Sequence, residues 1–323
     1  MIEKISLDSI WHSIEVGINF KFTYKKIDSK CIPDLNLGLD IDGNRCLVLL
    51  PPKFVPAGSG VITNIRRKNI ELFSSDEGEI ILLLKDQLHS ELFTDLVFAL
   101  YQEIHTVEVA NCAPLLIKLV QDWLELFEAK ERNGLGDDQV KGLIAELFVL
   151  ERHLEKDQTS HVNDLIKSWI GPFDTAKDFS FDGKDIEVKF KNIKASKVRI
   201  SSEFQLTCEP GKGLELWVVS GRFDSESGTN LSILNDSIKK LIVQRGGSMS
   251  NYLKSLRKIG INHETIKRYD HIKILLERLE AYDAVASSFP AIRKTSISDE
   301  VSMVSYNLNL TSLGAFKIFN ESI

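Results

Sequence analysis

The sequence predicts an α/β protein whose central sheet is mixed and flanked by helices. Up to about residue 90, short apolar runs such as CLVLLPPKF and GEIILLLKD lie between Gly, Pro and Asp, as is typical of strands. From about 91 to 156, apolar residues recur at three- and four-residue intervals, which is typical of helices. The middle of the chain then follows the order helix, four strands, helix. That order favours an α/β or α+β core.

The order of elements predicts three regions. We expect a β-rich N-terminal domain over 1–105, a core over 106–235 and an α+β region over 236–323. The core contains the helix DDQVKGLIAELFVLERHLEK, a short helix around DLIKSWIG, and the strand segments KDFSFDGKDIEVKF, VRISSEFQL and LELWVVSGRF. The last region begins with a helical block and ends in alternating segments that we expect to be strands.

Charge and cysteine usage limit the classes of function. The net charge of the 323 residues is -6, so binding of a nucleic acid would need a local basic patch. KDIEVKFKNIKASKVR has six basic and two acidic residues; an exposed, solvated run is the simpler interpretation. The four cysteines form no CxxC pair, which fits a reducing compartment. With no apolar run of signal or membrane-span length, we expect a cytoplasmic protein without a membrane partner.

The segment KDFSFDGKDIEVKF predicts a tight β-hairpin. Asp182-Gly183 is a two-residue turn of the type that favours hairpins. If Phe181 pairs with Lys184, the same register places Asp178 directly opposite Glu187. Like charges at such a position are destabilising, because opposed Cβ atoms lie about 4.5–5.5 Å apart.

Side-chain alternation sorts this hairpin into an apolar and a charged face. The charged face carries Asp178, Ser180, Asp185, Glu187 and Lys189. An exposed, salt-bridged surface is one interpretation. The long apolar segments on either side favour a central strand, where charges are costly unless they serve a site. A divalent cation such as Mg²⁺, which accepts one or two carboxylates and keeps waters, suits the opposed acids.

These residues resemble a known superfamily. Asp178 followed by Glu187-Val188-Lys189, spaced D-x8-E-x-K on two neighbouring strands, resembles the PD-(D/E)XK nucleases. GLIAELFVLERHL, WIGP, KDFSF, IEVKF and VRISSEFQL resemble a bacterial family of PD-(D/E)XK motif proteins often encoded near restriction–modification and other defence genes. The likeness is close over roughly 135–220. It departs at the superfamily's proline, because Lys177 directly precedes Asp178 and Pro172 lies six residues upstream.

The resemblance implies a restriction-endonuclease-like core and a role for each matched residue. Asp178, Glu187 and the Val188 carbonyl would hold Mg²⁺, with Mn²⁺ as a substitute. Lys189 would orient the attacking water and stabilise charge on the phosphate. Glu146, in the preceding helix, would reach the metal or the water; its position beside Gly142 and Ala145, off the main apolar stripe, fits that role. An ordinary surface glutamate is the alternative.

The expected function is therefore Mg²⁺-dependent hydrolysis of DNA in a prokaryotic defence setting. The expected nucleic-acid contacts are Lys191, Lys194, Lys197, Arg199, Ser202 and Gln205. The alternative is a catalytically silent nuclease-like module that binds nucleic acid or a partner subunit. RNA stays open as a substrate and defence proteins as partners. Cutting both strands of a duplex would require a homodimer or sequential nicking.

Overall fold

A computed structural model gives the fold and describes residues 4–17, 20–51, 63–128, 134–173 and 175–323. The chain forms two compact units, Met1–Glu131 and Arg132–Ile323. They are the first and second units below.

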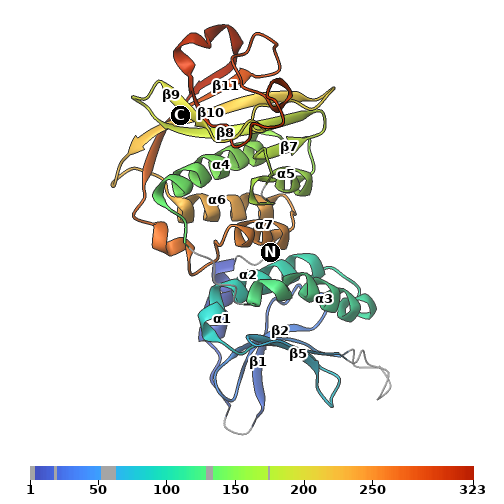
Figure 1. The fold of residues 1–323 in the computed structure, drawn as a ribbon. Coiled ribbons are helices and arrows are strands. Elements are labelled where there is room, and N and C mark those ends of the chain that lie inside the picture. Colours follow the sequence, from blue (N-terminus) through green and yellow to red (C-terminus); the bar gives the residue numbers. More distant parts are fainter. Residues whose placement is uncertain (1–3, 18–19, 52–62, 129–133, 174) are drawn as a thin grey trace. The chain divides into compact units, whose positions relative to one another are not determined.

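The first unit is a six-stranded antiparallel sheet with helices on one face (Figure 1). The strand order is β1-β2-β3-β6-β5-β4, with β1 Phe22–Lys26, β2 Leu35–Asp40, β3 Arg45–Leu49, β4 Asn64–Arg66, β5 Ile70–Ser74 and β6 Ile80–Leu84. The helices are α1 Lys4–His12, α2 Ser90–Ile104 and α3 Val109–Trp123. The four central strands β2, β3, β6 and β5 are short and mostly buried, whereas the edge strands β1 and β4 are more exposed, and most residues of α2 are buried.

The second unit is built on a mixed five-stranded sheet of order β13-β11-β10-β8-β7. The strands are β7 Phe179–Phe181, β8 Lys184–Asn192, β10 Gly213–Phe223, β11 Ile274–Asp283 and β13 Lys317–Ser322. The β8–β10 pair is parallel and the other pairs are antiparallel. The helices are α4 Asp137–Lys156, α5 Val162–Ser168, α6 Leu231–Gln244 and α7 Met249–Lys258. Strand β8 lies between two neighbours, as the sequence predicts.

Both faces of this sheet are covered (Figure 1). Helix α4 packs on the face that carries Phe179 and Trp217, whose rings contact His153, and α6 packs behind α4. On the other face lies a small sheet of β9 Lys197–Ile200 and β12 Tyr306–Asn309. Its side chains share a buried cluster with Leu214, Leu216 and Val218 of β10. The charged face of β8 therefore faces protein rather than water.

The division of the chain differs from the three expected regions. Helix α3 packs against α2, so the first unit extends past residue 105. Strands β11 and β13 pair into the same sheet as β8 and β10, so no separate region begins at residue 236. Only the start of VRISSEFQL is a strand, because residues 203–206 form a turn. Among the parts of the chain described, no helix is long and apolar enough to cross a membrane.

Candidate metal-dependent nuclease site

Helix α4 places Glu146 against the rest of the site. The predicted apolar stripe of this helix is buried throughout, which fixes the rotation of the helix about its axis. Glu146 is partly exposed beside that stripe. Its Oε2 atom accepts a hydrogen bond of 2.9 Å from the indole Nε1 of Trp169, a fully buried residue that follows α5.

The β7–β8 hairpin has the predicted register. Phe181 pairs with Lys184 and Phe179 with Ile186, and Gly183 has φ of +78°, a value that glycine adopts without strain. The strand pairing ends at Phe179 and Ile186, and the Asp178 N–H donates to the Ile186 carbonyl at 3.2 Å, so the direct opposition of Asp178 and Glu187 stays a prediction.

The hydrogen-bond ladder between these strands changes at Asp178. The Val188 N–H donates to the carboxylate of Asp178, Oδ2, at 2.7 Å. The backbone carbonyl of Asp178 instead accepts from the N–H groups of Ile170 and Gly171 at 2.8 and 3.0 Å. The carboxylate is thus fixed beside β8, while the Asp178 backbone bonds to β8 through its N–H, which donates to the Ile186 carbonyl at 3.2 Å, and to residues 170–171 through its carbonyl.

Glu187 and Lys189 lie on the charged face of β8. Glu187 is 1% exposed and the side chain of Lys189 is 15% exposed. The Lys189 Nζ atom donates to Glu187 Oε1 at 2.5 Å, whereas Glu187 Oε2 has no hydrogen-bond partner within the described part of the chain. A buried carboxylate oxygen without a partner is costly, so this atom is a ready ligand for a cation.

Gly171 brings two of the acids to a common point. A Cβ atom at this position would lie 2.9 Å from Glu146 Oε2 and 3.3 Å from Asp178 Oδ1. A side chain here would displace a carboxylate, so the absence of one allows both acids to face the same small volume.

The electrostatics of the cluster favour a positive ion. Burial raises the pKa of Glu187 to about 8, and the charge of Asp178 adds to the effect. Burial also raises the pKa of Glu146 well above its usual value, and that of Asp178, with Lys189 and the Val188 N–H opposing the second shift. For Lys189, burial opposes the charged form, but Glu187 and Asp178 outweigh it and raise its pKa. Three acids thus share one close lysine.

The residues present fit a hydrated divalent ion. The oxygens of Glu146, Asp178 and Glu187 do not all lie within 4.8 Å of one another, so they form no closed three-carboxylate cage. Mg²⁺ needs no such cage, because it binds to one or two carboxylates and retains waters. Asp178 and Glu187 suit direct ligation, and Glu146 suits a bridging water. These roles, and that of the Val188 carbonyl, stay predictions.

The predicted nucleic-acid contacts fall into two groups. Lys194, Lys197 and Arg199 are exposed, and Lys191 is half-buried, where burial lowers its pKa. Ser202 and Gln205 are partly exposed; Ser202 directly precedes the 203–206 turn and Gln205 lies within it, where its side chain accepts from the Ser201 N–H at 2.7 Å.

Three residues beside the acids were not identified as part of the site from the sequence. Trp169 and Gly171 lie in the matched segment WIGP without an assigned role, and Lys177 is noted only for standing where the superfamily has proline. Lys177 is in fact 8% exposed and donates to three backbone carbonyls. For Lys177, the only indication in the sequence is its position directly before Asp178, the first acid of the motif.

The hydrogen bond from Trp169 should affect catalysis through the position and the pKa of Glu146. We expect Trp169→Phe to lower the single-turnover rate of DNA cleavage about tenfold, since a hydrogen bond to a charged group contributes roughly 1.5–3 kcal/mol. The loss should be greatest at low pH, because this hydrogen bond lowers the pKa of Glu146. Trp217→Phe is a matched control, because Trp217 Nε1 donates to Glu215 Oε2 at 2.7 Å. An equal rate loss in both variants would point to a general packing defect.

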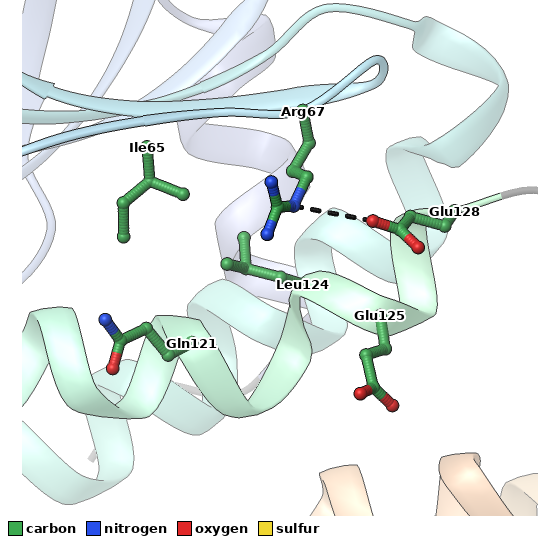
Figure 2. A pocket seen from close by; sticks show the side chains of 6 residues that line it. All are labelled: Ile65, Arg67, Gln121, Leu124, Glu125 and Glu128. Carbon is green, nitrogen blue, oxygen red and sulfur yellow. Dashed lines mark ion pairs between the residues drawn. The ribbon is translucent and has the colours of Figure 1, made fainter.

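The first unit has a hollow between its sheet and the end of α3. Its lining residues are Ile65, Arg67, Gln121, Leu124, Glu125 and Glu128 (Figure 2). Figure 2 shows Arg67 paired with Glu128, with 3.4 Å between Nε and Oε1. The neighbouring Arg66 pairs with Glu71 at 2.8 Å. The carboxylates of Glu128 and Glu71 partly neutralise the basic residues 66–68. This basic run therefore contributes little to a positive surface that could attract DNA.

The fold and this arrangement of acids and lysine define the class of protein: a member of the PD-(D/E)XK superfamily. A family model described as "Putative PD-(D/E)XK family member, (DUF4420)" matches residues 7–311. The chain therefore belongs to that family, and the match extends over both units. No curated protein and no solved structure matches the chain.

Proposed function

We propose that the protein is a Mg²⁺-dependent endonuclease that hydrolyses phosphodiester bonds of DNA. The observation that carries the proposal is the approach of Glu146 and Asp178 at Gly171, together with the buried Glu187–Lys189 pair on which the Asp178 charge acts; Glu187 Oε2 has no hydrogen-bond partner among the described residues. Membership in a family of PD-(D/E)XK proteins supports the same reaction type. A prokaryotic defence role rests on the gene setting that the sequence resemblance implies.

Each of the four side chains has a separate role in the proposed hydrolysis. Asp178 and Glu187 hold the ion, which supplies a Lewis acid for the phosphate and lowers the pKa of bound water. The Lys189 ammonium orients the attacking water and stabilises negative charge on the phosphate. Glu146, whose pKa is raised, is suited to hold a proton released from that water at neutral pH.

The exposed basic residues are suited to bind the DNA backbone. Lys197 and Arg199 alternate on β9 with the buried Val198 and Ile200, so both project to solvent. Together with Lys194 they would bind backbone phosphates without reading the sequence. Binding should therefore weaken steeply as salt rises.

Cleavage of a supercoiled plasmid tests the proposal. We expect the wild type to nick or linearise the plasmid with Mg²⁺ but not with EDTA. Lys189→Ala and Glu187→Ala should each remove this activity. Cleavage that persists in both variants would rule out the assigned site.

A silent, binding-only module is the second candidate, and one observation favours it. The Lys189 ammonium already lies 2.5 Å from Glu187 Oε1 and could neutralise the acids without metal. Calorimetry distinguishes the two functions: the nuclease binds Mg²⁺ or Mn²⁺ in a manner that depends on Glu187, whereas the silent module shows no such heat.

A further inference from the structure

Lys177 fixes a neighbouring turn to the site. Its Nζ atom donates to the carbonyls of Phe204, Gln205 and Thr207 at 2.7, 2.5 and 2.9 Å. Two of these carbonyls, those of Phe204 and Gln205, belong to the 203–206 turn, and that of Thr207 directly follows it; the Phe204 carbonyl also accepts from the Thr207 N–H at 3.2 Å. Because Lys177 directly precedes Asp178, one side chain ties the turn to a proposed metal ligand.

Further contacts hold the same turn. Glu203 is 2% exposed, and its Oε2 atom accepts from the Val304 N–H at 3.0 Å. Its carbonyl accepts from the Thr207 hydroxyl at 2.7 Å. Leu206 is fully buried in the apolar cluster beneath the turn. The backbone of the turn is therefore fixed by a buried cation, a buried anion and a buried leucine.

The ring of Phe204 projects from this fixed turn and is 47% exposed. A second ring, that of Phe173, is 49% exposed and lies two residues after Gly171, which borders Glu146 and Asp178. Single exposed apolar side chains are common and need no explanation. Here, however, both rings are attached to segments that directly adjoin the acid cluster, and the predicted contacts Ser202 and Gln205 flank one of them.

We propose that Phe204 stacks on an unpaired base of the strand being cut, so that the DNA at the scissile phosphate is single-stranded or is a locally opened stretch of a duplex, such as a supercoiled plasmid provides. The inference rests on the proposed nuclease function and adds a substrate class to it. A ring on a rigid support loses little conformational freedom on binding, and every base offers a face for stacking. Bases inside a duplex are stacked on one another and offer no such face. Phe173 supplies a second ring beside the site.

Binding without metal tests the proposal independently of cleavage. The probe is a short fluorescein-labelled single-stranded DNA, with its labelled duplex as comparison, followed by anisotropy in EDTA. We expect tighter binding of the single strand and a loss of roughly tenfold or more for Phe204→Ala, in keeping with the contribution of one stacked base. Phe204→Tyr should restore affinity and Phe204→Leu should not, because stacking needs an aromatic face rather than apolar bulk.

Phe223→Ala is the matched control, since this ring is 63% exposed at the end of β10; its affinity should equal that of the wild type. Preference for the duplex, or equal affinity of Phe204→Leu and the wild type, would overturn the stacking role while leaving Mg²⁺-dependent plasmid cleavage intact. Loss of that cleavage in the wild type would instead remove the proposed function, whatever the anisotropy shows.

Discussion

Replacing Lys189 by methionine should slow DNA cleavage by about 10³-fold, the upper range for removing one group that stabilises the transition state. Methionine keeps much of the length of the side chain and removes the charge. The loss has two parts. The ammonium no longer faces the phosphate, and Glu187 loses the cation 2.5 Å from its Oε1 atom. Because Lys189 lowers the pKa of Glu187, its removal should move metal binding to higher pH.

Single-turnover cleavage over a range of pH, with Mg²⁺ saturating, measures both parts. Lys212→Met is the matched control. Lys212 lies 2.6 Å from Asp185, a buried acid two residues from Glu187 on the same face of the same strand. That variant should cleave at nearly the wild-type rate. A Lys189→Met protein within tenfold of the wild type would show that this lysine has no part in the chemistry.

The metal-free protein should lose stability as pH rises from about 5 to about 8. Burial raises the pKa of Glu187 to about 8, so the folded state holds a proton that the unfolded state releases near its ordinary pKa. Where the folded state binds more protons, the free energy of unfolding falls as pH rises. For Glu187 alone the fall is about 4 kcal/mol at most, from the size of the pKa change. Glu187→Gln should flatten this dependence, because an amide does not titrate.

Magnesium should reverse the trend in the wild type, since the ion binds to the ionised acids and stabilises the folded state by mass action. Thermal unfolding between about pH 5 and pH 8, with EDTA or Mg²⁺, is the measurement. Asp185→Asn, which removes another buried carboxylate from the same face, should keep the magnesium response. If Glu187→Gln gains as much from magnesium as the wild type does, Glu187 is not a ligand.

The sequence was enough to predict the parts of the site that depend on local rules. A two-residue Asp-Gly turn determines the hairpin register from Phe181–Lys184 to Phe179–Ile186, whereas the predicted opposition of Asp178 and Glu187 lies beyond the pairs that the hairpin forms. The apolar stripe of α4 likewise determined that Glu146 lies beside the buried face rather than on it. In both cases the relevant partners lie within a few residues of one another, so spacing carries the information.

Contacts between distant segments could not be predicted in this way. The hydrogen bond from Trp169 to Glu146 and the contacts from Lys177 to the 203–206 turn each join separate elements. The burial of Lys177 is also not expected from the sequence, because burying a charged ammonium group is costly. That cost is offset only in the folded chain, where three carbonyls accept hydrogen bonds from the ammonium. The division into units failed for a related reason: β11 joins β10 across two intervening helices.

All four proposed catalytic side chains, and the tryptophan, glycine and lysine beside them, come from one uninterrupted stretch between Glu146 and Lys189, within a single unit. Evolution can therefore vary the first unit without altering the chemistry. A substitution anywhere in the first unit would leave every one of these side chains unchanged.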